Sequence, residues 1–180
     1  MNAAVALGCT LRDIAQYADS VSMCFSKGLG CPIGSVLVGS SQFVSRAYRL
    51  RKGLGGGWRQ AGVIAAPCIY SLENAMQWLK LDHDNAKILA KDINKLEPIG
   101  YASVDVSTVE TNIFIISLKE NRAQELCDLL RKEWPGLPKI FADPLDNCKV
   151  RIVTHRHFAQ KDVTSVIARL QASLNTLVSL

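Results

Sequence analysis

Two short segments near the start of the chain have the alternating pattern of β-strands. In Ser20–Phe25 small polar and apolar residues alternate with a period of two, and Ile33–Val38 is an apolar run of strand length. Both segments are too apolar for either face to be exposed to water, and a sheet of only two strands is marginally stable. We therefore predict that these strands end a larger α/β sheet.

Helical periodicity dominates the rest of the first half. Helix caps are expected at Ser40–Ser41, which can accept backbone hydrogen bonds, and at Gly53, which can close a helix. The predicted helices cover residues 2–18 with a break at 8–10, residues 41 to 51 or 52, and residues 59 to about 95, interrupted near Asp82 and kinked or restarted at Pro67.

The pattern changes after residue 95. β-Branched segments predict strands, amphipathic segments predict helices, and a segment rich in proline predicts a turn-rich connection. The strands are expected at 111–118 and 150–154, the helices at 121–133 and 159–177, and the connection at 135–144. We therefore predict two domains: the end of a large α/β domain over residues 1–82 and a C-terminal α+β small domain over residues 83–180.

Composition excludes several classes of function. The 180 residues are 48% hydrophobic with a net charge of +5, and no apolar run reaches the length of a membrane span. The basic residues are spread out and lack an aromatic platform, which argues against nucleic-acid binding. The six cysteines form no CxxC pair, so we expect reduced thiols and a cytoplasmic location.

Lys27 is the leading candidate for chemistry. It lies in Ser26–Gly30, at the exit of the first predicted strand, and Gly28, Gly30 and Gly34 allow a ligand to approach the main chain. A lysine amine is protonated in water, but burial beside a cofactor can lower its pKa and free it to bond with a carbonyl carbon.

Two other interpretations of this segment stay open on the local pattern. A lysine in a turn between strands is usually a solvated charge, because long charged side chains tend to stay exposed. A serine hydrolase could use Lys27 as the base for Ser22 or Ser26, but the spacing is not SxxK and no SDN or KTG motif follows.

Several motifs in order resemble those of the low-specificity L-threonine aldolases, which are fold-type I enzymes dependent on pyridoxal 5'-phosphate (PLP). They are SKGLGCPIGS at 26–35, RKGLGGGWRQAG at 51–62 and LDHDNA at 81–86. The resemblance covers residues 18 to 90. It implies a lyase that cleaves threonine or allothreonine to glycine and acetaldehyde, in a homo-oligomer with sites between subunits.

The resemblance also implies site residues. Lys27 would bond to PLP, while Lys52 and Arg59 would contact the phosphate of a neighbouring subunit's cofactor. The local pattern agrees, because the glycines at 55–57 lead into a predicted helix whose first N–H groups favour an anion. A flexible hinge with solvated cations is the alternative.

Arg151 is the fourth candidate. Alternation along the predicted strand places it on one face with Val153 and His155. Its planar guanidinium suits a carboxylate, and the family places the α-carboxylate of the substrate there. Exposure at a strand edge is the alternative. His155 and His157 lack nearby cysteines or carboxylates, so we expect no metal site.

In the family, several groups that contact the PLP ring lie upstream of the portion resembled here. They are a stacking histidine, an aspartate that pairs with the ring nitrogen, an arginine and a phosphate-binding turn. We therefore expect a truncated chain that is poorly active alone, and leave open whether it is an enzyme. The alternative function is a catalytically impaired fragment that acts only as an assembly partner or remnant.

Overall fold

The computed structural model describes residues 1–179 and divides the chain into two compact units. The first is Met1–Leu79 and the second begins at Lys80. The boundary lies within the long helix α4, Gly62–Ile93. The two units are described separately below.

The first unit begins with two short helices, α1 (Asn2–Leu7) and α2 (Leu11–Ala15). The predicted break between them is confirmed. Gly8 ends α1 in the left-handed region with φ of 63°, which favours glycine. Thr10 then begins α2 with a capping box, in which its hydroxyl and Asp13 satisfy each other's backbone N–H groups.

The strands of the first unit form an antiparallel pair. Strand β1 (Ser20–Cys24) pairs with β2 (Ser35–Gly39), from Ser20 opposite Gly39 to Cys24 opposite Ser35. Helix α3 (Ser41–Gly53) follows, and the Ser40 side chain accepts a hydrogen bond of 3.2 Å from the Phe43 N–H, as the predicted N-cap requires.

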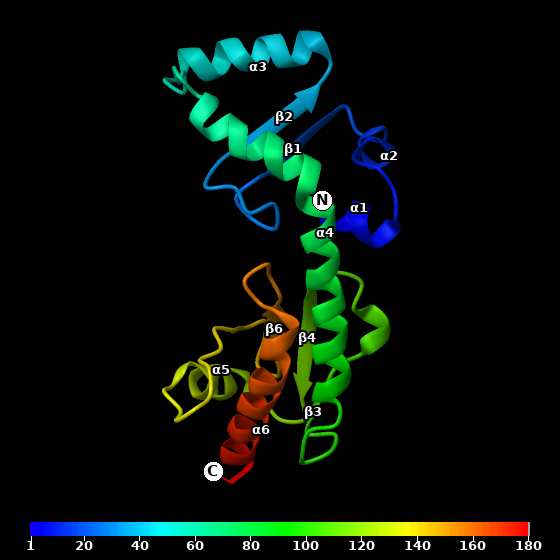
Figure 1. Cartoon of the computed structure of the whole chain (residues 1–180), viewed down its shortest axis with the longest axis vertical. Helices are drawn as coiled ribbons and strands as arrows, with labels where there is room; N and C mark the ends of the chain where they lie inside the picture. Colours follow the sequence, from blue (N-terminus) through cyan, green and yellow to red (C-terminus); the bar gives the residue numbers. More distant parts are fainter. Residues whose placement is uncertain (180) are drawn as a thin grey trace. The chain divides into compact units, whose positions relative to one another are not determined.

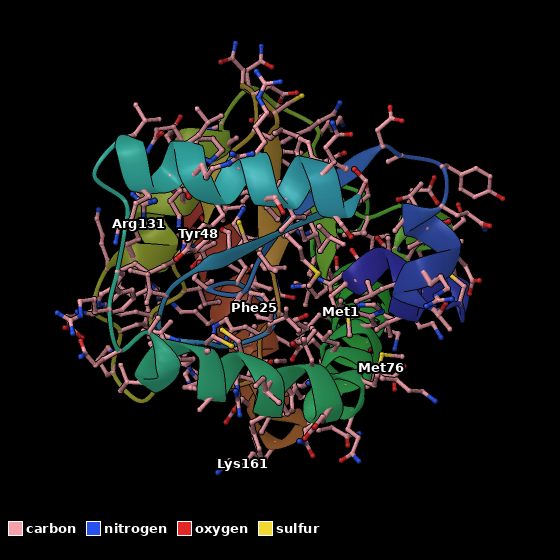
Figure 2. The ribbon with its side chains drawn as sticks, turned by 90° about the horizontal axis from the view of Figure 1, so that it is seen from above. Met1, Phe25, Tyr48, Met76, Arg131 and Lys161 are labelled. Atoms are coloured by element: carbon pink, nitrogen blue, oxygen red, sulfur yellow. The ribbon has the colours of Figure 1, made fainter. Side chains whose placement is uncertain are left out.

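The core of the first unit is small. It consists of Phe25, Leu29 and Cys31 from the connection between β1 and β2, packed on Ala75 and Leu79 of α4. In Figure 2, Phe25 lies between α3 (cyan) and the start of α4 (teal). The loop after β1 is therefore held against a helix by its own apolar side chains.

The second unit has a four-stranded antiparallel sheet in the order β3-β4-β6-β5. The strands are β3 (Ala102–Ser103), β4 (Ile113–Leu118), β5 (Asp143–Pro144) and β6 (Lys149–Val153). The helices are the rest of α4, α5 (Ala123–Arg131) and α6 (Val163–Ser179), with short 3-10 turns at Val106–Thr108 and Gln160–Asp162. Figure 1 shows α4 and α6 in front of β4 and β6.

This sheet has one buried and one exposed face. Phe114 and Ile116 alternate inward on β4 and join a core with α4, α5 and α6, whereas Ile113 and Ile115 on the other face are 42% and 38% exposed. Strands β4 and β6 and helices α5 and α6 were predicted. The two-residue strands β3 and β5 were not, because so short a pairing has no sequence periodicity.

The predicted interruption near Asp82 is wrong. Helix α4 runs without a break through this position. Its buried stripe recurs every three or four residues, so a carboxylate occupies a stripe position without ending the helix; the stripe consists of Ala75, Leu79, Asp82, Ala86, Leu89 and Ile93. Pro67 is also inside α4. No helix within residues 1–179 is long and apolar enough to cross a membrane.

Candidate active site

The turn that carries Lys27 is closed by its own backbone. The Phe25 N–H donates to the Gly34 carbonyl at 2.9 Å, and the Cys31 N–H donates to the Phe25 carbonyl at 3.0 Å. Within this closure, the Gly30 N–H donates to the Lys27 carbonyl at 2.7 Å. Gly30 has φ of 71°, a conformation that a residue with a Cβ adopts at a cost.

Two side chains of α4 anchor the residues after Lys27. The Trp78 indole Nε1–H donates to the Gly28 carbonyl at 3.0 Å, and the Ser71 hydroxyl donates to the Leu29 carbonyl at 2.5 Å. Ser71 is only 3% exposed, so its bond to Leu29 is sheltered from water. The carbonyls that follow the lysine are therefore fixed to a helix.

The packing at Gly28 is close. A Cβ at this position would lie 3.0 Å from Cδ2 of Leu79, which is fully buried, and 3.4 Å from the Asn2 side-chain amide. The Lys27 side chain, in contrast, is exposed and makes no hydrogen bond or ion pair within residues 1–179. The structure thus presents an unpaired primary amine on a rigid turn.

Lys52 and Arg59 flank the glycine-rich connection between α3 and α4. The Lys52 side chain lies along Gly57, where a Cβ would come within 2.7 Å of Lys52 Cδ. Gly55 has φ of 86°, so this connection also uses glycine for its backbone conformation. Both cationic side chains are exposed.

The expected helix start at Arg59 is wrong by three residues. Helix α4 begins at Gly62, and Gln60 has a positive φ of 51°, which is not helical. Arg59 therefore lies in the connection before the helix. Its charge is available to an anion, but it does not occupy the first turn whose N–H groups would add to it.

Arg151 lies on the exposed face of the second unit's sheet. It is opposite Ile115 of β4 and Asp143 of β5, and Val153 shares its face, as alternation predicted. The Asp143 carboxylate pairs with Arg131 at 2.7 Å. The guanidinium of Arg151 has no ion pair within the described part of the chain and is free to bind an anion.

His155 does not share that strand face, because β6 ends at Val153. It lies in the turn that follows, with its ring centroid 5.8 Å from that of His157. Within residues 1–179, no group of three or more histidine, cysteine, aspartate or glutamate side chains is arranged to hold a metal ion.

Sequence reasoning did not identify the two anchors, Ser71 and Trp78. A signal was present, because both occur at helical spacing around the buried Ala75. A serine and a tryptophan on the buried side of a helix must find hydrogen-bond partners. The partner could not be read from the sequence, because it is a backbone carbonyl some 40 to 50 positions away.

The chain is similar in sequence to known proteins. The chain is 42% identical over 170 residues to a probable low-specificity L-threonine aldolase 2 of Arabidopsis thaliana, covering 93% of this chain and 46% of that protein. It is 39% identical over 173 residues to a low specificity L-threonine aldolase of Escherichia coli K12, covering 96% of this chain and 48% of that protein. The chain spans about half the length of these curated relatives and matches their C-terminal portion.

Solved structures show the same fold. A putative aromatic amino acid beta-eliminating lyase/threonine aldolase from Exiguobacterium superposes with a TM-score of 0.75 at 21% identity, over 96% of this chain and 49% of that one. A putative L-allo-threonine aldolase from Listeria monocytogenes gives 0.73 at 19% identity, over 94% and 48%. These likenesses confirm the predicted α/β fold class. Residues 1–120 match the family model described as beta-eliminating lyase, and the chain belongs to this family.

Proposed function

We propose that this chain is the C-terminal portion of a PLP-dependent lyase that cleaves threonine or allothreonine to glycine and acetaldehyde. Membership of the family and the names of the similar aldolases support the reaction class. In this proposal Lys27 holds the cofactor covalently, Lys52 and Arg59 bind the phosphate of a neighbouring subunit's cofactor, and Arg151 binds the substrate α-carboxylate.

The chemistry of the exposed side chains fits PLP and an amino acid. PLP carries an aldehyde, which bonds with a primary amine, and Lys27 offers one that is exposed on a fixed turn. The phosphate needs cationic partners, and Lys52 and Arg59 flank one glycine-rich connection. The backbone at Gly28 packs closely on α4, since a Cβ there would lie 3.0 Å from Leu79 Cδ2. The residues present therefore suit the group.

When bound, PLP supplies the electron sink that stabilises the negative charge left on Cα as the Cα–Cβ bond breaks. The chain's own contribution is positioning and proton handling. Ser71 and Trp78 fix the backbone turn from which the Lys27 side chain extends. The Lys27 amine would also be placed to hold a proton or to carry one to or from the reacting atoms.

Arg151 is proposed from the second unit alone. Its guanidinium is a planar fork of N–H donors that matches a carboxylate bidentately. The strand ladder on both sides of it, to β4 and β5, limits the movement of its backbone. Because Asp143 is already paired with Arg131, an incoming carboxylate does not have to displace a protein carboxylate from Arg151.

The observation that carries the proposal is the anchored turn. An ordinary surface lysine needs no buried serine or indole to fix the two carbonyls after it. Here both carbonyls are held by α4 while the lysine side chain stays unpaired. This arrangement is expected where a reactive amine must meet a ligand at a defined position.

Trapping of the cofactor tests the assignment. The chain is incubated with PLP, alone and together with the N-terminal half of the Escherichia coli relative, reduced with borohydride and mapped by mass spectrometry. We expect the pyridoxyl group on Lys27 and no label at this site in Lys27→Ala. The control is Lys80→Ala, which replaces an exposed lysine of α4 and should keep the label on Lys27. Label spread equally over several lysines, or unchanged in Lys27→Ala, would contradict the proposal.

A second candidate function is assembly with another polypeptide of the same family. It is favoured by an apolar hollow of about 470 Å³ in the first unit, lined by residues that include Ile14, Met23, Val36 and Val38. Val38 is 51% exposed there. In this case the chain would bind the relative in size-exclusion chromatography, yet Lys27→Ala would leave the acetaldehyde released from threonine by the mixture unchanged.

We further propose a homo-oligomer as the working state, because the family resemblance assigns Lys52 and Arg59 to a neighbouring subunit's cofactor. The six free cysteines suit a reducing compartment, and we propose the cytoplasm. Sedimentation of the reconstituted protein tests the first point. A monomer that traps PLP on Lys27 and releases acetaldehyde would contradict it.

A further inference from the structure

The segment that follows strand β6 is held by buried polar side chains from separate parts of the second unit. It runs from Thr154 to Phe158, directly after the strand that carries Arg151. The Thr154 side chain is buried, and its hydroxyl donates to the Asp82 backbone carbonyl of α4 at 2.6 Å. This bond ties the end of β6 to the long helix.

Two asparagines complete the attachment. Asn112, just before β4, donates from Nδ2 to the Thr154 carbonyl at 2.8 Å, and the Thr154 N–H donates to the Asn112 carbonyl at 2.9 Å. Asn85, one turn along α4 from Asp82, donates to the Phe158 carbonyl at 3.2 Å. We call Thr154, Asn112 and Asn85 the polar clamp.

Such a clamp is a costly way to fill a core. Burying an amide or hydroxyl costs free energy unless its hydrogen bonds are made, and apolar residues would pack there without that risk. Asn85 is 1% exposed and Thr154 is 2% exposed. These bonds give the backbone a defined position at both ends of the segment. Arg151 lies three residues before Thr154, where the segment begins.

The acceptor oxygens around the clamp are incompletely satisfied. Oδ1 of Asp82, Asn85 and Asn112 are all buried without a hydrogen-bond partner within the described residues. For Asp82 this concerns a carboxyl group that is only 2% exposed. Ionisation of a buried carboxyl with an unpartnered oxygen costs free energy, because its charge is poorly solvated.

The charges that act on Asp82 come from the clamped segment. Burial raises the pKa of the Asp82 carboxyl, while His155 and Arg156 lower this pKa through their positive charges. On its own helix, Asp82 has the buried His83 and the exposed Asp84 as neighbours in sequence. The protonation of Asp82 is therefore linked to the position of the turn that contains His155.

We propose that Thr154, Asn112 and Asn85 are positioning residues for Arg151, and that the Asp82 carboxyl makes the segment they hold sensitive to pH. The part that concerns the substrate carboxylate rests on the proposed function of Arg151. The positioning itself does not, because it can be measured without cofactor or substrate.

The first experiment removes one bond of the clamp in the full chain. Thr154→Val keeps the shape and loses the hydroxyl, and Thr164→Val, at an exposed position of α6, is the control. The loss of a hydrogen bond of about 1 kcal/mol corresponds to about a fivefold fall in amide protection. We expect this fall at Phe158, whose N–H donates to the His155 carbonyl, and a shift of the Arg151 Nε NMR signal.

Conservative variants keep this test decisive. Thr154→Ser retains a hydroxyl and should restore the protection at Phe158. If Thr154→Val fails to fold, Asn85→Ala removes a different bond of the clamp and should cause the same loss at Phe158. Unchanged protection and an unchanged Arg151 signal in a folded clamp variant would overturn the positioning role.

The second experiment follows the Asp82 carboxyl by carbon NMR during a pH titration. His155→Gln removes a positive charge that lowers the pKa of Asp82, so this pKa should rise further, whereas His157→Gln in the same turn should leave the pKa of Asp82 unchanged.

In the unmodified chain the Arg151 Nε signal should change over the pH range in which Asp82 titrates, and Asp82→Asn should abolish that change. Equal effects of the two histidine variants, or an Arg151 signal that does not follow Asp82, would overturn the link to pH. Failure of PLP trapping at Lys27 would leave all these results unaffected.

Discussion

Removal of the Ser71 hydroxyl tests how the Lys27 turn is held. Ser71→Ala eliminates the bond to the Leu29 carbonyl in a position that is 3% exposed, so water cannot readily replace it. An unsatisfied buried acceptor costs about 1–3 kcal/mol. Alanine regains up to about 0.7 kcal/mol through its higher helix propensity in α4. Taken from the middle of the range of about 1–3 kcal/mol, the expected net loss at this turn is about 1–2 kcal/mol.

Amide hydrogen exchange is the appropriate assay, because the chain has two units and a single unfolding transition is not guaranteed. The Gly30 and Cys31 N–H groups, which donate to carbonyls within the turn, should exchange about 5–30 times faster in Ser71→Ala. Ser45→Ala, at an exposed position of α3, is the matched control. Equal exchange at Gly30 in both variants would show that the Ser71 hydroxyl does not hold the turn.

Three further changes have expected outcomes. Burial raises the pKa of Asp82 above its ordinary value of 3.8. The free energy of unfolding should therefore fall as the pH rises from the unfolded-state pKa through the folded-state pKa. In urea titrations Asp82→Asn should remove this pH dependence, and Asp84→Asn should keep it. Leu130→Ala, at a fully buried position of α5, should cost about 2–5 kcal/mol in urea unfolding of the second unit, and a cost below about 1 kcal/mol would contradict the assigned core. Gly28→Ala places a Cβ 3.0 Å from Leu79 Cδ2 and should destabilise the first unit by about 1–3 kcal/mol on thermal melting, with an unchanged melting temperature as the opposing result.

Local pattern determined most of the secondary structure. The break before α2, the start of α3, strands β4 and β6 and helices α5 and α6 follow from caps, alternation and helical periodicity, which act over a few residues. The continuity of α4 depended on packing instead. We predicted an interruption near Asp82, but Asp82 and His83 are buried in the folded chain, and only the tertiary structure provides that burial.

The same division applies to the site. The sequence by itself placed Lys27 at the end of a strand, Lys52 and Arg59 beside a glycine-rich connection and Arg151 on a strand face, because motif and alternation are local properties. Only the tertiary structure decided that the Lys27 turn is anchored by Ser71 and that the segment after Arg151 is clamped. Both devices join groups about 40 or more positions apart in the chain, and such pairings form only when the hydrophobic cores bring those segments together.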